Sequence, residues 1–149
     1  FDQILAGTLN NPITHTYTEP GLYQPVITII DRANNSHREV LAVNIQDKGQ
    51  TDQIIRELWG SMNAALVAGN HGLATESITD SSMSGYGRIF YLLLPHMNSI
   101  VSGYTDIAVV DLGLTYGEYA VGEEIDGSSR IFLIQFMQDY QGVWRLEGM

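Results

Sequence analysis

The chain has 149 residues, of which 44% are hydrophobic and 16% are charged. This composition is typical of one ordinary globular domain or of two small ones, and it excludes a disordered chain. The formal net charge is −10. Because a surface of that sign repels phosphate groups, we expect no nucleic-acid partner. Cysteine is absent, which excludes disulfides, thiolate metal sites and a cysteine nucleophile.

The apolar stretches are too short or too interrupted to span a bilayer. The longest, residues 89–101, contains Pro95, His96 and Asn98, so we predict no membrane insertion. The histidines are scattered along the chain without an i, i+4 pair: His15, His37, His71 and His96. A zinc site needs clustered ligands, so we predict neither a metal site nor a cofactor.

The pattern of residues changes along the chain. Residues 1–46 are rich in Thr, Val, Ile and Tyr with turn residues between them, residues 51–102 have helical periodicity, and residues 104–149 alternate as strands do. The polar segment 46–50 separates the first pattern from the second. We therefore predict two domains, residues 1–47 and residues 51–149.

The first domain is predicted to contain a hairpin. Apolar residues alternate over 23–29 and again over 41–45, and the polar residues 31–36 form a turn between them. Two strands alone are marginally stable in water, so we expect this hairpin to need a partner sheet.

Two segments of this domain resemble a known family. HTYTEPGLY at 15–23 and ITIID at 27–31 resemble the C-terminal half of a PKD domain, an immunoglobulin-like β-sandwich in which an H-x-Y-x-x-P-G-x-Y turn leads into an alternating strand that ends in Asp. The resemblance covers residues 13–46 and implies truncated sandwich strands, with the front strands expected before Phe1. Pro25 departs from the family pattern, and because proline cannot donate to a ladder we expect an edge or a bulge there.

The second domain is predicted to begin with three helices. Thr51 and Asp52 form the predicted cap of the first, whose apolar stripe over 54–66 ends at Gly69. Asn70 caps a short second helix. Ser81 or Ser82 caps the third, which contains Pro95 and is expected to kink there.

Four strands are predicted after the helices, at 104–114, 115–125, 129–138 and 143–149, with a turn at 139–142 before the last. Three helices followed by an antiparallel meander predict an α+β fold whose helices cover one concave face of the sheet.

The second domain resembles the nuclear transport factor 2-like superfamily, also described as a cystatin-like cone. The likeness lies in LW at 58–59, MNAAL at 62–66, GN at 69–70, SS at 81–82, Tyr86, IF at 89–90 and DYQGVWRL at 139–146. In that family a D-x-x-G turn leads into W-[KR]-[IL]. The resemblance implies a cone of helices on a curved sheet, and it does not define one activity, because this fold hosts isomerases, dehydratases, transport factors and inert modules.

Aromatic and sulfur-containing side chains are predicted to line the cone and to bind a small molecule, with Gln135 as a polar group. Pockets of this kind are concave and apolar with few polar groups, whereas the alternative is that the same residues form the core. The predicted ligand-binding residues are Trp59, Met62, Tyr86, Phe90, Tyr116, Tyr119, Gln135 and Trp144.

An enzyme is the alternative function. The ketosteroid isomerase branch of the superfamily uses an Asp base with a Tyr and a protonated Asp. The residues considered for such roles are Asp106, Asp111, Tyr116, Glu118 and Tyr119. They do not match that branch's pattern, so we predict no catalytic residue. An enzyme of this type needs a carboxylate within hydrogen-bond reach of a tyrosine in a water-poor pocket.

The sequence therefore predicts a non-enzymatic spacer and binding module of a larger bacterial surface or secreted protein. We expect it to be extracellular, on the cell surface or periplasmic. Its expected partners are neighbouring domains of the parent protein and a small apolar ligand or a glycan. We also expect either a homodimer through the truncated sandwich strands or packing of this hairpin against the α+β domain, because unpaired strand edges and an apolar face invite pairing.

Overall fold

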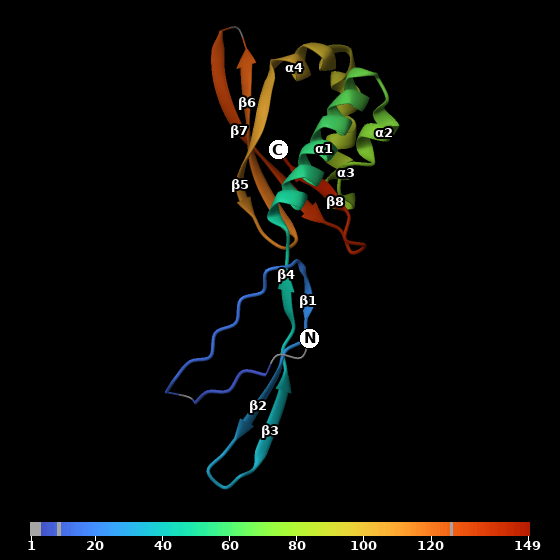
Figure 1. The fold of residues 1–149 in the computed structure, drawn as a ribbon. Helices are drawn as coiled ribbons and strands as arrows, with labels where there is room; N and C mark the ends of the chain where they lie inside the picture. The colour runs from blue at the N-terminus through green and yellow to red at the C-terminus, as the bar shows by residue number, and fades with distance from the viewer. Residues whose placement is uncertain (1–3, 9, 126) are drawn as a thin grey trace. The chain divides into compact units, whose positions relative to one another are not determined.

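The computed structural model describes residues 4–8, 10–125 and 127–149. The chain divides into two compact units, unit 1 at Phe1–Asp47 and unit 2 at Lys48–Met149. Unit 1 contains strands and unit 2 contains helices followed by a sheet (Figure 1). The predicted α+β class is confirmed.

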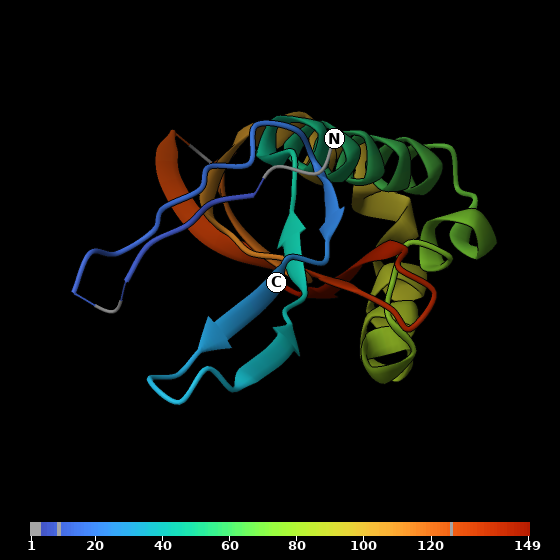
Figure 2. The ribbon, with the colours of Figure 1, turned by 60° about the horizontal axis from the view of Figure 1, so that its bottom comes forward.

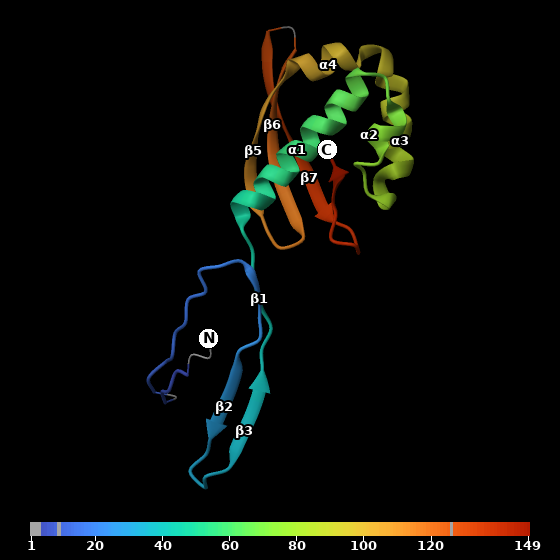
Figure 3. The ribbon, with the colours of Figure 1, turned by 45° about the vertical axis from the view of Figure 1, so that its right-hand side comes forward.

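Unit 1 is built on a long, interrupted hairpin (Figure 3). Strand β1 (Gly21–Tyr23) pairs with β4 (Val43–Ile45), and β2 (Val26–Ile30) pairs with β3 (Ser36–Val40), both antiparallel. The interruption falls at Pro25, which cannot donate to a ladder. On the opposite strand Leu41, expected inside a continuous strand, lies between β3 and β4 and donates its N–H to the Pro25 carbonyl at 3.0 Å.

The turn between β2 and β3 is held by its own side chain. Asp31 Oδ1 accepts hydrogen bonds from the backbone N–H groups of Ala33 and Asn35, both at 2.8 Å. Between them Asn34 has a φ of 67°, a left-handed conformation that asparagine tolerates. Hydrogen bonds from Asn35 are the main reason that the pKa of Asp31 is lowered. The turn is therefore stabilised by a side chain, and it is one residue shorter than the predicted 31–36 because Ser36 already pairs with Ile30 in β3.

Unit 1 has no hydrophobic core of its own. Among its described residues none is classed as buried, and the isoleucines of β2 remain between 43% and 65% exposed. Its order comes from local contacts instead, such as the rings of Tyr17 and Tyr23, whose centroids are 4.2 Å apart.

The helices of unit 2 are α1 (Lys48–Val67), α2 (His71–Thr75), α3 (Asp80–Leu93), the 3₁₀ turn η1 (Leu94–His96) and α4 (Met97–Gly103). Gly69, with a φ of 73°, follows the end of α1. Asn70 caps α2 as predicted, because its side chain accepts from the Leu73 N–H at 3.1 Å. Pro95 lies in η1, where its missing N–H separates the predicted third helix into α3 and α4.

Two helix starts differ from the sequence prediction. Helix α1 begins at Lys48, so Thr51 and Asp52 lie inside it and do not cap it. The Asp52 carboxylate binds a side chain one turn later instead. The cap of α3 is Thr79, two residues before the first predicted serine, and its hydroxyl accepts from the Ser82 N–H at 3.3 Å.

The sheet of unit 2 contains β5 (Tyr104–Leu112), β6 (Tyr116–Ile125), β7 (Ser128–Gln138) and β8 (Trp144–Gly148), antiparallel in the order β5-β6-β7-β8. The strands lie where the sequence predicts them. The helices cover one face of the sheet and leave the other open (Figure 2). At the β8 edge, Leu146 donates to the Ser77 carbonyl at 2.8 Å and accepts from the Thr79 N–H at 3.0 Å, which covers ladder groups that would otherwise be unpaired.

The core lies between α1 and the covered face of the sheet. Each of its large apolar side chains stabilises the fold by about 1.5–3 kcal/mol when it is fully buried. The residues that form this contact, all at most 7% exposed, are Ile55, Trp59, Met62 and Leu66 of α1 with Tyr119, Val121, Ile134, Phe136 and Leu146 of the sheet.

We predict that Leu146→Ala lowers the free energy of unfolding by about 2–5 kcal/mol, because the side chain is 0% exposed and its loss leaves a cavity. Leu92→Ala is the matched control: Leu92 is 63% exposed on α3 and its truncation should change stability by about 0.5 kcal/mol or less. Urea unfolding of the two variants measures the difference. Equal losses would contradict the core described above.

Candidate functional site

Five of the eight predicted ligand-binding residues come together in the core of unit 2. Exposure is 7% or less for each of them, and they pack with the other buried residues of α1, α3, β6 and β8. They are Trp59, Met62, Phe90, Tyr119 and Trp144. Ligand binding by these side chains remains a prediction.

The other three predicted residues lie elsewhere. Tyr86 is half-buried on α3, where its hydroxyl donates to the Met149 carbonyl at 2.8 Å and accepts from the Met149 N–H at 2.7 Å. Tyr119 faces the helices, and side chains alternate along a strand, so Tyr116 and Glu118 of β6 point to the open face of the sheet. Gln135 of β7 pairs with Glu118 and therefore lies on that open face too. The eight residues therefore do not surround one space.

A carboxylate and a tyrosine do meet on the open face. Glu118 Oε1 accepts from the Tyr116 hydroxyl at 3.2 Å and from Gln135 Nε2 at 3.3 Å. Desolvation and the hydrogen bond to Glu118 raise the pKa of Tyr116. Asp106 and Asp111, also considered for enzyme roles, are exposed. This group is only half-buried, whereas proton transfer between a carboxylate and a tyrosine requires a water-poor pocket.

A depression of about 400 Å³ lies where the start of α1 meets the end of β5. The helix contributes one cationic and one anionic side chain, and the strand contributes mainly apolar ones. The lining residues are Lys48, Gly49, Asp52, Val109, Val110, Asp111 and Leu112. An apolar wall with few polar groups is the usual composition of a small-molecule site.

Asp52 is held in place at this depression by Arg56, one helical turn later. Arg56 Nε donates to Asp52 Oδ2 at 2.9 Å, and its Nη1 donates to Asp106 Oδ1 at 3.2 Å and to the Ile107 carbonyl. The hydrogen bond to Asp52 is the largest cause of the raised pKa of Arg56. The guanidinium thus connects α1 to the edge strand β5 and leaves one Asp52 oxygen, Oδ1, without a hydrogen bond.

Tyr119 lies behind Asp52 in the core. Its side chain is 0% exposed, and its hydroxyl makes no hydrogen bond of normal geometry in the structure. Burial is the main cause of the strongly raised pKa of Tyr119, and the neighbouring Asp52 carboxylate adds to it. Both this hydroxyl and Asp52 Oδ1 are buried, so neither atom is open to a molecule in the depression.

This arrangement can bind a small molecule that presents a hydroxyl or amine group to Asp52 and an apolar body to Val109, Val110 and Leu112. From the sequence, Asp52 is predicted only as part of a helix cap. The spacing of Asp52 and Arg56 is a signal for the ion pair, because oppositely charged residues at i and i+4 meet on a helix surface. The pairing of Asp52 with Tyr119 has no such local signal.

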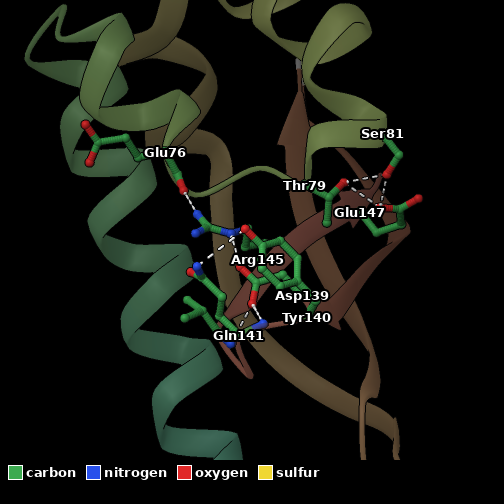
Figure 4. Close-up of polar contacts among 9 residues, drawn as sticks. Glu76, Thr79, Ser81, Asp139, Tyr140, Gln141, Arg145 and Glu147 are labelled. Carbon is green, nitrogen blue, oxygen red and sulfur yellow. Dashed lines mark hydrogen bonds and ion pairs between the residues drawn. The ribbon is translucent and has the colours of Figure 1, made fainter.

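A second polar network surrounds β8 and serves the fold (Figure 4). Glu147 Oε2 accepts from the hydroxyls of Thr79, at 2.5 Å, and Ser81, at 2.9 Å, at the start of α3. Arg145 bonds Asp139 Oδ2 at 2.8 Å and also the Glu76 carbonyl. These contacts attach the edge strand to the helices, and in the close-up Arg145 meets the backbone carbonyl of Glu76 while the Glu76 side chain points away.

The described residues offer neither a metal cluster nor a membrane span. Within residues 4–8, 10–125 and 127–149, no three histidines or carboxylates lie close enough together to hold a metal ion. Over the same residues, no helix has both the length and the apolar character of a membrane span.

Comparisons with protein families, with curated proteins and with solved structures gave no match. The function must therefore be argued from the chain's own geometry.

We predict that the free energy of unfolding falls as the pH rises above about 10. Tyrosine titrates near 10 in an unfolded chain, and the pKa of Tyr119 is higher in the folded state. The folded state then holds a proton that the unfolded state has lost, so stability present below pH 10 decreases above it. Tyr119→Phe should reduce this alkaline slope, and near pH 7 it should cost about 0.5–1.5 kcal/mol because the contact of the hydroxyl with the Asp52 carboxylate is lost.

Tyr140→Phe is the control, because Tyr140 is 92% exposed and its replacement should leave the slope unchanged. The measurement is urea unfolding between pH 7 and 11. A wild-type slope in Tyr119→Phe, or a cost of several kcal/mol at pH 7, would contradict the environment assigned to this hydroxyl.

Proposed function

We propose that this chain is a non-enzymatic spacer and binding module of a larger, extracellular bacterial surface or secreted protein. In this proposal unit 1 supplies PKD-like sandwich strands, and unit 2 is a nuclear transport factor 2-like domain that binds a small ligand. The observation that carries the proposal is the depression at α1 and β5, whose lining combines an apolar wall with the Asp52 carboxylate.

One contact in unit 1 supports the sandwich assignment. The Tyr23 hydroxyl donates to the backbone carbonyl of Glu19, four residues upstream, at 2.7 Å. A tyrosine near the start of a strand that bonds the backbone a few residues earlier is the tyrosine corner of Greek-key sandwiches. The exposed apolar strand β2 is also what a sandwich sheet presents when no second sheet packs on it.

The surroundings of the carboxylates support a binding role over an enzymatic one. Glu118 meets its tyrosine on the open face of the sheet. Asp52 is paired with Arg56, which ties it to the fold. Tyr119 is fully buried and does not line the depression. A proton donor and base for one substrate are therefore not presented together to a ligand in the depression.

The ligand class follows from the lining of the depression. Val109, Val110 and Leu112 offer an apolar surface, and Asp52 offers an acceptor for a hydroxyl or an amine. A glycan presents hydroxyl groups along an apolar ring face, and a small amphiphile presents one polar group on an apolar body. Both match this lining better than a purely anionic compound, which the negative charge of the chain disfavours.

We predict that a panel of glycans, lipids, small organic acids and calcium contains a compound that raises the melting temperature of the full chain. A ligand that binds only the folded state adds about 2.7 kcal/mol at one hundred times its dissociation constant. Asp52→Asn should remove the shift. Asp106→Asn is the matched control, because it also loses a contact with Arg56 but does not line the depression.

A glycan or lipid shift that Asp52→Asn abolishes and Asp106→Asn retains is the expected result of this screen. A shift that survives in both variants would place the ligand at another surface. A panel without any glycan or lipid shift would contradict the binding role.

A further inference from the structure

Strand β2 has one edge that no other described strand covers. It pairs with β3 on one side only, in a sheet of two strands (Figures 1 and 3). Two-stranded sheets are marginally stable in water, and an unpaired edge is a template for another strand.

The backbone groups on this edge can be assigned from the hairpin register. Pro25 accepts from the Leu41 N–H, and the Asp31 N–H donates to the Asn35 carbonyl, so odd-numbered residues of β2 direct their backbone groups to β3. In an antiparallel pair the residues between them direct theirs the other way. Val26, Thr28 and Ile30 therefore present their N–H and C=O groups at the uncovered edge. Pro25, which lacks an N–H, faces β3 and does not interrupt this edge.

The two edges of the hairpin differ in charge. Strand β2 has the sequence VITII with no charged residue, whereas β3 contains His37, Arg38 and Glu39. Charged side chains on an edge strand oppose pairing, and uncharged β-branched residues favour it. The side chains of β2 are also available, since Val26, Ile29 and Ile30 are 46%, 52% and 65% exposed. The β2 edge, and not the β3 edge, is therefore suited to an added strand.

We propose that the added strand is β2 of a second copy of this chain, antiparallel to the first about a twofold axis at Thr28. This register places Val26 opposite Ile30 of the second copy, Ile27 opposite Ile29, and Thr28 opposite Thr28. The three outward-facing residues of each copy become hydrogen-bonded pairs and close about six backbone hydrogen bonds.

Every facing pair in this register is compatible in chemistry. Aliphatic β-branched side chains meet one another, and two threonine hydroxyls meet at the axis. A twofold axis makes the same patch self-complementary and closes the assembly at a dimer. The result is a four-stranded sheet with the charged β3 strands at its outer edges, where they oppose further growth. The dimer involves unit 1 and is independent of the ligand proposed for unit 2.

Charge substitutions at Thr28 test this register. Wild type should have twice the 16.5 kDa mass of one chain by light scattering after size exclusion. Thr28→Glu should raise the dissociation constant of the dimer by about tenfold or more, because two like charges then face each other at the axis. Within its own hairpin the new glutamate lies opposite Arg38, so the hairpin itself is not weakened. Thr28→Lys should weaken the dimer in the same way, but its lysine also faces the like charge of Arg38 within the hairpin, which the glutamate does not.

An equimolar mixture of Thr28→Glu and Thr28→Lys should recover the dimer, because opposite charges then meet at the axis. Arg38→Glu, directly across the hairpin from Thr28, is the control on the other edge and should leave the dimer intact. A wild-type monomer up to about 100 μM would overturn the proposal. Dimers that persist in both Thr28 variants, or a mixture that stays monomeric, would overturn it too.

Discussion

The burial of the apolar face of α1 against the sheet is the interaction on which the rest of unit 2 depends. Ile55 and Leu66 of the helix and Phe136 of the sheet are at most 1% exposed, and they lie at the centre of one continuous core. This contact fixes which face of the sheet is covered. It also brings α1 against β5, where Arg56 reaches the Ile107 carbonyl of the edge strand and where the candidate depression forms.

Unit 1 follows a different principle. It has no buried residue among those described, so its shape comes from the Asp31 turn, the Tyr23 hydroxyl and strand pairing. Hydrogen bonds of this kind contribute roughly 0.5–1.5 kcal/mol each, which is small beside the core of unit 2. Because unit 1 has no core among its described residues, the isoleucines of β2 are exposed and one edge of β2 is unpaired. The two proposed binding surfaces divide in the same way, with a ligand on unit 2 and a second copy on unit 1.

Much of the fold could be predicted because its signals are local. Alternation located the strands of unit 2 but missed β3 of unit 1, and Gly69, Asn70 and Pro95 marked helix ends and a break. The start of α1 could not be placed, because Lys48, Gly49 and Gln50 carry no helical signature and their conformation is decided by context. The arrangement of the candidate site was harder to predict from the sequence. Tyr116 and Tyr119 are three residues apart on one strand, so their parity already places them on opposite faces. The meeting of Asp52 with Tyr119, 67 positions apart, depends on tertiary packing that no local pattern encodes.

The central claim is that unit 2 carries its own core and folds without unit 1. The most direct measurement is urea unfolding of residues 48–149 expressed alone, compared with the full chain. We expect one cooperative transition with the same midpoint as the unfolding of unit 2 within the full chain, because the buried side chains in the described structure all belong to unit 2. Loss of the cooperative transition, or a midpoint lowered by more than about 1 M urea, would show that α1 and the sheet depend on residues 1–47 and would contradict the claim.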